Sequence, residues 1–367
     1  MSGTTWSNAG LLRRKPGVLG DGKHGKRWTG LIFLFCCSFV LSGRSQETSP
    51  LLPGSKPADI RADWKPWIGD YGSLKEPRVV LERDGHLFLS NQTKQWQLNE
   101  VSPGSFALPT SNEPDAPLVR FIRQPSGGLV LNTGKMSLDR LDYGIDAKDV
   151  ARIKPVRPIE DLRKEALDTS PPIETDHFRK PELVELNPLD PTIHLDVRYA
   201  TSNDFLGTPV YSQARAFLQR PAAEALLRIQ QKLQPFGYGL LIHDAYRPWY
   251  VTKIFWEATP PEGKIFVADP AQGSRHNRGC AVDLTLYDLA SGKPIEMPGT
   301  YDEMSPRSFP SYPGGTSLQR WHRDLLRRAM ESEGFSVYES EWWHFDYKDW
   351  KEYSILNVPF EKLGSVH

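Results

Sequence analysis

The chain has 367 residues, and 45 Lys and Arg are balanced by 45 Asp and Glu, so its formal net charge is zero. This balance argues against a nucleic-acid partner, because such proteins carry a basic excess or stripe that faces the phosphates. Only three cysteines are present, which excludes a disulfide framework and a cysteine-rich zinc finger. The 11 Trp, 13 Tyr and 16 Phe are enough to build a packed core, and the length suggests about two domains.

Residues 1–45 are typical of an export signal. Basic residues up to Arg27 precede the apolar run 31–41, and small residues follow it. The run is shorter than the roughly 20 residues of a membrane-spanning helix, which favours a signal, with a single N-terminal membrane anchor as the alternative. We therefore expect an exported protein of the periplasm or cell envelope, or, if the segment is retained, one anchored in the inner membrane.

Residues 46–60 are rich in Pro and Ser and are predicted to be a linker. In residues 61–150, short β-type runs alternate with turn residues, and the Asp84-Gly85 pair between two such runs indicates a hairpin. We expect a small all-β module here, either a meander or a barrel, without a catalytic motif. Residues 151–190 are rich in proline and charge and are predicted to be a connector.

From residue 191 to about 360 the pattern becomes that of the α+β class. Arg220-Pro221 begins an amphipathic helix with apolar positions at Leu226, Ile229 and Leu233, and a second helix is predicted over residues 317–333. Strands are predicted over residues 193–199, 239–243 and 342–347.

A polar loop, residues 274–280, leads into a strand in which Asp283 faces away from the aliphatic side chains. A carboxylate at such a position needs water, a cation or a hydrogen-bond network. If the Arg278-Gly279 turn brings His276 back beside Asp283, the two side chains supply two of the three protein ligands of an open zinc site.

The segment Glu341-Trp342-Trp343-His344 contains residues that complete such a site. Three protein ligands and a water make a catalytic zinc centre, and zinc lowers the pKa of its water towards ~7. A nearby carboxylate that is not a ligand then moves the proton, and Glu341 is placed for that role. Since positions three apart in a regular strand face opposite sides, we expect a bend at Glu341.

A third polar segment, Asp244–Pro248, directly follows the predicted strand that ends at His243. Within it, Arg247 is a permanent cation that can hold a developing oxyanion or a substrate carboxylate by forked hydrogen bonds. A structural ion pair is the alternative role of Arg247.

Together these motifs resemble the D-alanyl-D-alanine dipeptidases, zinc peptidases that share their fold with the hedgehog signalling domain and the D,D-carboxypeptidases. The pattern Ser-x-His-x-x-Gly-x-Ala-x-Asp with a downstream Glu-x-Trp-His is specific for this wider group, and the Tyr-Ala-Thr and Asp-x-Tyr-Arg-Pro segments narrow it to the dipeptidases. The resemblance covers under half of the chain, in the segments Arg198–Thr201, Asn203–Gly207, Asp244–Pro248, Ser274–Leu286, Tyr301–Met304 and Glu341–His344.

The resemblance implies a central antiparallel sheet flanked by helices and one Zn2+ held by His276, Asp283 and His344. It also implies Glu341 as the catalytic base and Arg247 as the arginine that stabilises the transition state. Further family positions around the dipeptide are matched by Tyr199, Ser274, Asp302, Trp342 and Asp244. Roles as plain core aromatics remain open for Tyr199 and Trp342, and a turn role remains open for Asp302.

The expected activity is therefore zinc-dependent hydrolysis of the small dipeptide D-alanyl-D-alanine to two D-alanine, in cell-wall peptide turnover. One alternative is a D,D-carboxypeptidase acting on longer peptidoglycan stem peptides, and another is a catalytically inactive cell-wall binding protein. Dipeptidases of the vancomycin-resistance type lack an export signal, so the export signal and the β module of this chain suggest a substrate pool outside the inner membrane.

Overall fold

The computed structural model describes residues 49–108, 118–146 and 148–364. The predicted export signal, residues 1–45, lies outside the described residues. Within the described part of the chain, the structure contains no helix of the length and apolar character needed to cross a membrane.

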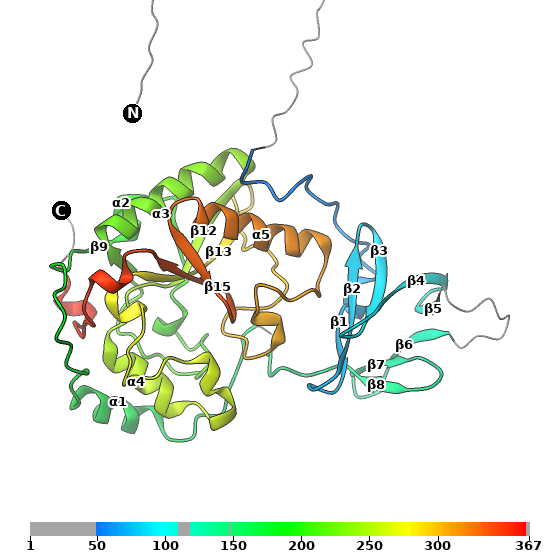
Figure 1. Ribbon diagram of the computed structural model, residues 1–367. Helices are drawn as coiled ribbons and strands as arrows, with labels where there is room; N and C mark the ends of the chain where they lie inside the picture. Colours follow the sequence, from blue (N-terminus) through cyan, green and yellow to red (C-terminus); the bar gives the residue numbers. More distant parts are fainter. Residues whose placement is uncertain (1–48, 109–117, 147, 365–367) are drawn as a thin grey trace, which may run out of the picture. The chain divides into compact units, whose positions relative to one another are not determined.

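The predicted β module is an antiparallel meander of eight strands that pair in chain order (Figure 1). The turn at Asp84-Gly85 joins the second and third strands as predicted, and both residues have positive φ, 50° and 79°, as this tight hairpin turn requires. An isolated bridge between Tyr71 and Arg140 brings the first strand to the chain that leaves the last one. The strands are β1 (Gly69–Gly72), β2 (Pro77–Arg83), β3 (His86–Ser90), β4 (Gln95–Ser102), β5 (Ser105–Ala107), β6 (Val119–Arg123), β7 (Leu129–Asn132) and β8 (Ser137–Asp139).

The stretch predicted as a connector contains regular structure. Helix α1 (Ile159–Leu167) buries Ile159, Leu162 and Ala166 and packs against helix α4 (Trp249–Ala258). Strand β9 (Leu183–Glu185) pairs with β11 (Phe217–Gln219), and the short helix α2 (Leu186–Leu189) follows it. The connector prediction missed α1 because this short helix, with only three buried apolar positions, stands among prolines and charges. Much of this stretch therefore belongs to the C-terminal core.

A five-stranded sheet forms the centre of the C-terminal part, in the order β10-β12-β13-β15-β14. All neighbours are antiparallel except β10 and β12, which run parallel. This mixture of helices with a mainly antiparallel sheet is compatible with the predicted α+β class. The strands are β10 (His194–Leu195), β12 (Tyr238–Asp244), β13 (Ala281–Asp288), β14 (Phe335–Tyr338) and β15 (Glu341–Tyr347).

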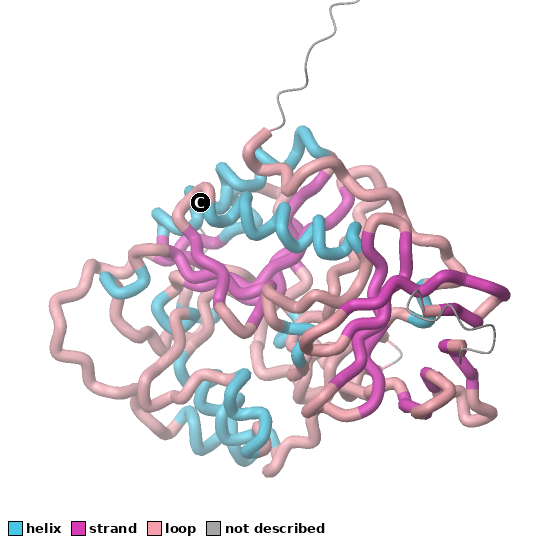
Figure 2. The backbone as a smooth tube through the Cα atoms, turned by 45° about the vertical axis from the view of Figure 1, so that its right-hand side comes forward, coloured by secondary structure: helices cyan, strands magenta, loops and turns pink. Residues whose placement is uncertain are grey.

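Helices α3 (Arg220–Leu233) and α5 (Ser317–Glu331) lie together along one face of this sheet, while α1 and α4 lie on the other side (Figures 1 and 2). Both predicted helices form, because each has an apolar stripe and a start signal. The predicted stripe of α3, Leu226, Ile229 and Leu233, is fully buried, and Thr316 caps α5 by accepting from the amide of Gln319. The described 3-10 helices are Lys65–Trp67, Arg198–Ala200, Gln234–Phe236, Pro261–Phe266, His276–Arg278, Pro306–Ser308, Trp350–Glu352 and Phe360–Lys362.

The β module and the C-terminal part have separate apolar cores. One is centred on Tyr71, Leu87 and Phe106, and the other collects the apolar faces of α3, α4, α5 and the five-stranded sheet. The described residues from 49 to 364 nevertheless cluster as one compact unit, so the two cores are parts of a continuous body.

Candidate active site

A tight turn places His276 beside the strand that carries Asp283. The 3-10 helix His276–Arg278 ends at Gly279, where φ is +67° and a Cβ would come within 2.5 Å of Leu183. Glycine adopts this left-handed conformation without strain and leaves room for Leu183, so the chain can reverse and enter β13. As the sequence predicted, His276 Nε2 then lies 3.3 Å from Asp283 Oδ1.

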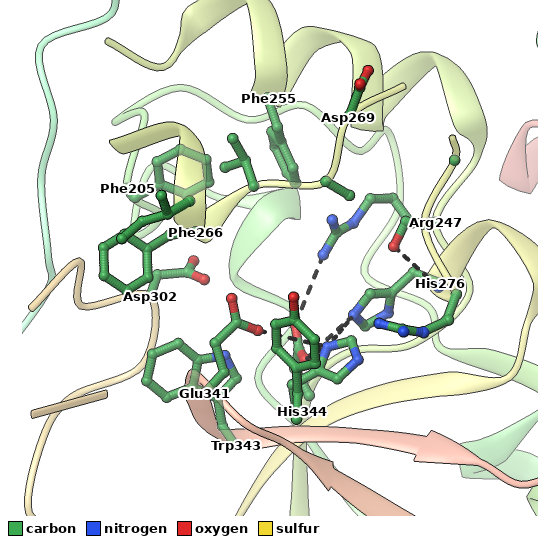
Figure 3. A pocket seen from close by; sticks show the side chains of 18 of the residues that line it. Phe205, Arg247, Phe255, Phe266, Asp269, His276, Asp302, Glu341, Trp343 and His344 are labelled. Carbon is green, nitrogen blue, oxygen red and sulfur yellow. Dashed lines mark hydrogen bonds and ion pairs between the residues drawn. The ribbon is translucent and has the colours of Figure 1, made fainter. Parts of the chain in front are cut away.

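His344 reaches the same carboxylate from the neighbouring strand. In the antiparallel pairing of β13 and β15, Asp283 is directly opposite His344, so their side chains lie on the same face of the sheet. His344 Nδ1 is 3.1 Å from Asp283 Oδ1 and also 3.1 Å from His276 Nε2. One cluster thus collects the three residues that the resemblance implied as ligands (Figure 3).

The bend expected at Glu341 is present. The register between β14 and β15 shifts abruptly, from Val337 opposite Phe345 to Tyr338 opposite Glu341. Such an irregularity changes which face a side chain takes. Glu341 consequently turns towards His344, with 3.7 Å between Glu341 Oε2 and His344 Nδ1.

The three clustered atoms match the donor set of a metal site. Their separations of 3.1–3.3 Å are close to the edge of about 3.4 Å expected for a tetrahedron with bonds of about 2.1 Å. Asp283 Oδ1 is buried and accepts no hydrogen bond from the described residues, which fits an oxygen that binds a cation.

The far nitrogens of both imidazoles are held by acceptors. His276 Nδ1 is 2.7 Å from the carbonyl oxygen of Ala245, and His344 Nε2 is 2.9 Å from Asp346 Oδ1. Each of these far nitrogens therefore carries its proton, which leaves the lone pair of the other nitrogen directed at the shared centre. This arrangement orients both rings for metal binding.

The Glu341 carboxylate lies 3.7 Å from His344 Nδ1, an atom of the cluster, without being part of the cluster. Burial raises the pKa of Glu341 to about 7. A carboxyl group with a pKa near neutrality exchanges a proton readily at physiological pH.

Arg247 lies across the cavity from Glu341 (Figure 3). Its Nε and Nη2 donate to Asp244 Oδ2 at 2.9 and 2.8 Å, and Tyr211 donates to the other oxygen of Asp244. Arg247 Nη2 is also 3.8 Å from Asp283 Oδ2. The ion pair that the sequence left open as an alternative is thus present, and it holds the guanidinium at the cavity wall.

The cavity has a volume of about 580 Å³. In Figure 3, Phe255 from α4 lies on one side of it, and His344 and Glu341 from the sheet lie on the other. The sequence-predicted residues that line it are Tyr199, Arg247, Ser274, His276, Asp283, Asp302, Glu341 and His344.

Two of the predicted substrate contacts are not among the lining residues. Asp244 is buried behind Arg247, and Trp342 is buried in the apolar core. The neighbouring Trp343 lines the cavity in place of Trp342. The structure therefore gives Asp244 an orienting position and Trp342 a packing position.

Asp302 is held in an unusual conformation at the cavity wall. Its φ is +59°, in the left-handed region that costs a non-glycine residue roughly 1–2 kcal/mol. Asp302 Oδ1 accepts a hydrogen bond of 3.0 Å from the Tyr199 hydroxyl. Burial, together with the charge of Asp283, raises the pKa of Asp302 well above its usual value.

Two site residues had no role in the sequence-based prediction. Tyr301 donates its one hydroxyl hydrogen to Asp283 Oδ2 at 3.1 Å, and its oxygen lies 2.9 Å from the Tyr199 hydroxyl oxygen. Asp346 orients His344. Asp346 could have been found, because it is two residues from His344 in a strand and so shares its face. Nothing in the local sequence singles out the hydroxyl of Tyr301.

Known proteins match the part of the chain that carries this site. A family described as D-ala-D-ala dipeptidase matches residues 179–362, about half of the chain. The D-alanyl-D-alanine dipeptidase of Escherichia coli (strain K12) is 36% identical over 179 residues, which are 49% of this chain and 91% of that protein. Those of Enterococcus faecium and Enterococcus faecalis are each 35% identical, over 44% and 43% of this chain and 90% and 88% of theirs.

The matches and the His-Asp-His cluster together define a metallopeptidase. The chain belongs to the D-alanyl-D-alanine dipeptidase family. The β module, with residues 61–150, lies entirely outside the matched region.

Proposed function

We propose that this protein is a zinc peptidase that hydrolyses D-alanyl-D-alanine to two molecules of D-alanine in cell-wall peptide turnover. The observation that carries the proposal is the cluster of His276, Asp283 and His344 with the buried carboxylate of Glu341 beside it. The proposal is further supported by the matched relatives, which are named D-alanyl-D-alanine dipeptidase.

His276 Nε2, His344 Nδ1 and Asp283 Oδ1 would hold the Zn2+ ion. Two imidazoles and one carboxylate are a donor set typical of catalytic zinc, and they leave a position open for solvent or substrate. A bound Zn2+ supplies a Lewis acid and a nucleophilic water at neutral pH.

Glu341 accepts the proton of the attacking water and passes it to the leaving amine. Its carboxylate lies beside the cluster but outside it, 3.7 Å from His344 Nδ1, within reach of a water held there. Arg247 donates hydrogen bonds to the carbonyl oxygen as negative charge develops there, and Asp244 keeps the guanidinium in place.

Tyr199, Ser274 and Asp302 line the remaining wall and are the proposed substrate contacts. The ammonium group of a dipeptide is the proposed partner for Asp302, because the buried Oδ2 of this carboxyl group in the cavity wall accepts no hydrogen bond from the described residues. A free ammonium is present in a dipeptide and absent at the corresponding nitrogen of a longer stem peptide.

A D,D-carboxypeptidase remains the second candidate because of the size of the cavity. Its volume of about 580 Å³ lies within the ~300–1,000 Å³ range of pockets for small ligands, which leaves room beyond two alanines. The third alternative, a binding protein without turnover, is disfavoured by the completeness of ligands, base and arginine. We propose export to the periplasm or cell envelope, with inner-membrane anchoring as the alternative.

Hydrolysis assays and metal analysis on one purified sample distinguish these functions. We expect release of D-alanine from D-alanyl-D-alanine, loss of this release with a chelator, and recovery on addition of zinc. Faster release from a pentapeptide stem than from the dipeptide would favour the carboxypeptidase. Bound zinc with no hydrolysis of either substrate would favour the inactive binding protein.

A further inference from the structure

We propose that the β module positions one wall of the active site, through hydrogen bonds from Tyr312 and Tyr143 to the buried carboxylate of Asp70. The wall is the loop of residues 298–316, which runs from the region after β13 to the start of α5. The expected effect on turnover rests on the proposed dipeptidase function, whereas the expected effect on the loop does not.

The 298–316 loop carries side chains into the site. Tyr301 donates to Asp283 Oδ2 at 3.1 Å, and Asp302 lies in the cavity wall opposite Arg247 (Figure 3). Glu303 and Met304 line the same cavity. Any displacement of this loop would therefore move Tyr301, the hydrogen-bond partner of Asp283, and Asp302, a proposed substrate contact.

The loop has little regular structure to hold its shape. Its only regular segment is the 3-10 helix Pro306–Ser308. Asp302, which precedes this helix in the loop, has a left-handed backbone conformation. A loop with a strained residue keeps that conformation only when surrounding contacts determine it. The contacts of the loop with the rest of the chain are therefore decisive.

The central contact is a carboxylate of the β module. Asp70 in β1 is only 2% exposed, and its two oxygens accept one hydrogen bond each, from the Tyr312 and Tyr143 hydroxyls, both at 2.7 Å. Tyr312 belongs to the loop, and Tyr143 belongs to the chain that leaves the β module. Short hydrogen bonds to a buried acceptor fix the position of both donors.

Further contacts hold both ends of the loop. At its far end, Gly315 forms a bridge with Leu81 and accepts from the amide of Glu82 at 3.1 Å. The Glu82 carboxylate in turn accepts from the amide of Ser317, the first residue of α5, at 2.6 Å. At its near end, Thr300 donates to the carbonyl oxygen of Asp149 at 2.8 Å.

All of these outside partners lie before residue 179, where the family match begins. Asp70, Leu81, Glu82, Tyr143 and Asp149 therefore support the site from a part of the chain that the family match does not include. The β module is in this way a structural part of the active site, and Tyr312 and Tyr143 are positioning residues.

The test compares three variants of the full-length protein. Tyr312→Phe and Tyr143→Phe each remove one hydroxyl from Asp70. Tyr71→Phe is the matched control, because Tyr71 is fully buried in the same module and donates at 2.7 Å to the carbonyl of Trp67, away from the loop. The measurements are amide hydrogen exchange of residues 298–312, and kcat and KM for D-alanyl-D-alanine.

For Tyr312→Phe we expect exchange in residues 298–312 to become at least tenfold faster, and KM to rise about three- to tenfold with a smaller change in kcat. Tyr143→Phe should shift both quantities in the same direction by less, and Tyr71→Phe should leave both unchanged. The control also loses a buried hydroxyl, so it shares any general destabilisation of the module. A rise in KM that occurs in Tyr312→Phe and not in the control is therefore due to the position of the loop.

Unchanged loop exchange in Tyr312→Phe would overturn the proposal, as would equal effects of the Tyr71→Phe control. If Tyr312→Phe does not fold, Tyr143→Phe decides, and wild-type exchange of the loop in that variant overturns the proposal. If the wild-type protein hydrolyses no D-dipeptide, the proposed function fails, while hydrogen exchange still decides whether the β module holds the loop.

Discussion

Asp346 should control zinc affinity although it is not a ligand. Its Oδ1 is 2.9 Å from His344 Nε2, and its side chain is only 13% exposed. A hydrogen bond to a charged group in such a position is worth about 1.5–3 kcal/mol. If most of this energy serves to orient the imidazole, Asp346→Ala should weaken zinc binding by about 10- to 100-fold, the range found for groups that orient metal ligands.

Asp346→Asn gives an intermediate case. The amide oxygen can still accept from His344 Nε2, but the charge that strengthens the bond is lost. The ion pair between Arg275 Nε and Asp346 Oδ2, at 3.3 Å, also loses its charge. We therefore expect a loss of zinc affinity of up to about tenfold, smaller than that of Asp346→Ala.

The assay is a competition between each variant and a chromophoric zinc chelator, which yields the dissociation constant without any substrate. Asp349→Ala is the matched control, because Asp349 lies three residues further along and pairs with Arg179, away from the cluster. Wild-type zinc affinity in Asp346→Ala would refute the orienting role. An equal loss in the control would show that the effect is not specific to His344.

Three further predictions concern the base, the core and pH. Glu341→Gln should lower kcat by about 10²- to 10⁴-fold while zinc content by metal analysis stays at the wild-type level; full activity would remove Glu341 from the mechanism. Leu226→Ala should lower the free energy of unfolding by about 2–5 kcal/mol in urea titration, because Leu226 is fully buried in α3; a change below 1 kcal/mol would contradict this packing. Burial lowers the pKa of His322 to about 4. Between pH 6.5 and 4, the unfolded chain therefore binds a proton at His322 that the folded chain does not bind. The free energy of unfolding should accordingly fall as the pH falls through this range. His322→Gln should make this loss smaller in urea titrations at pH 7 and pH 4.5, and an unchanged loss would show that other groups cause it.

Much of the metal cluster could be predicted because its determinants are local. Asp283 alternates with aliphatic residues along one strand, and Gly279 marks the turn that returns His276 to it. The need for a bend at Glu341 also followed from strand geometry, since residues three apart in a regular strand face opposite sides.

The bend was expected at Glu341, but its effect on the two neighbouring tryptophans could not be predicted. In the structure Trp343 lines the cavity and Trp342 is packed in the core. A shift of register by one residue exchanges the faces of a strand, so the pattern Glu-Trp-Trp-His alone does not tell which ring faces the substrate.

The contacts that hold the 298–316 loop were also beyond sequence reasoning. Tyr312 is 242 residues from Asp70, and nothing in either local segment indicates its partner. Helix α1 was missed for a different reason, since its stability comes from packing three side chains against the C-terminal core rather than from a long periodic pattern.

The bridge between Tyr71 and Arg140 has a consequence for the solution behaviour of the β module. Together with the hydrogen bond from the Leu141 amide to the Asp70 carbonyl, it gives β1 partners on both of its sides. Outer strands with free amides and carbonyls recruit other extended chains, and pairing the two ends of a meander removes that opportunity. A module of this kind can accompany a peptidase without promoting association of its copies through strand pairing.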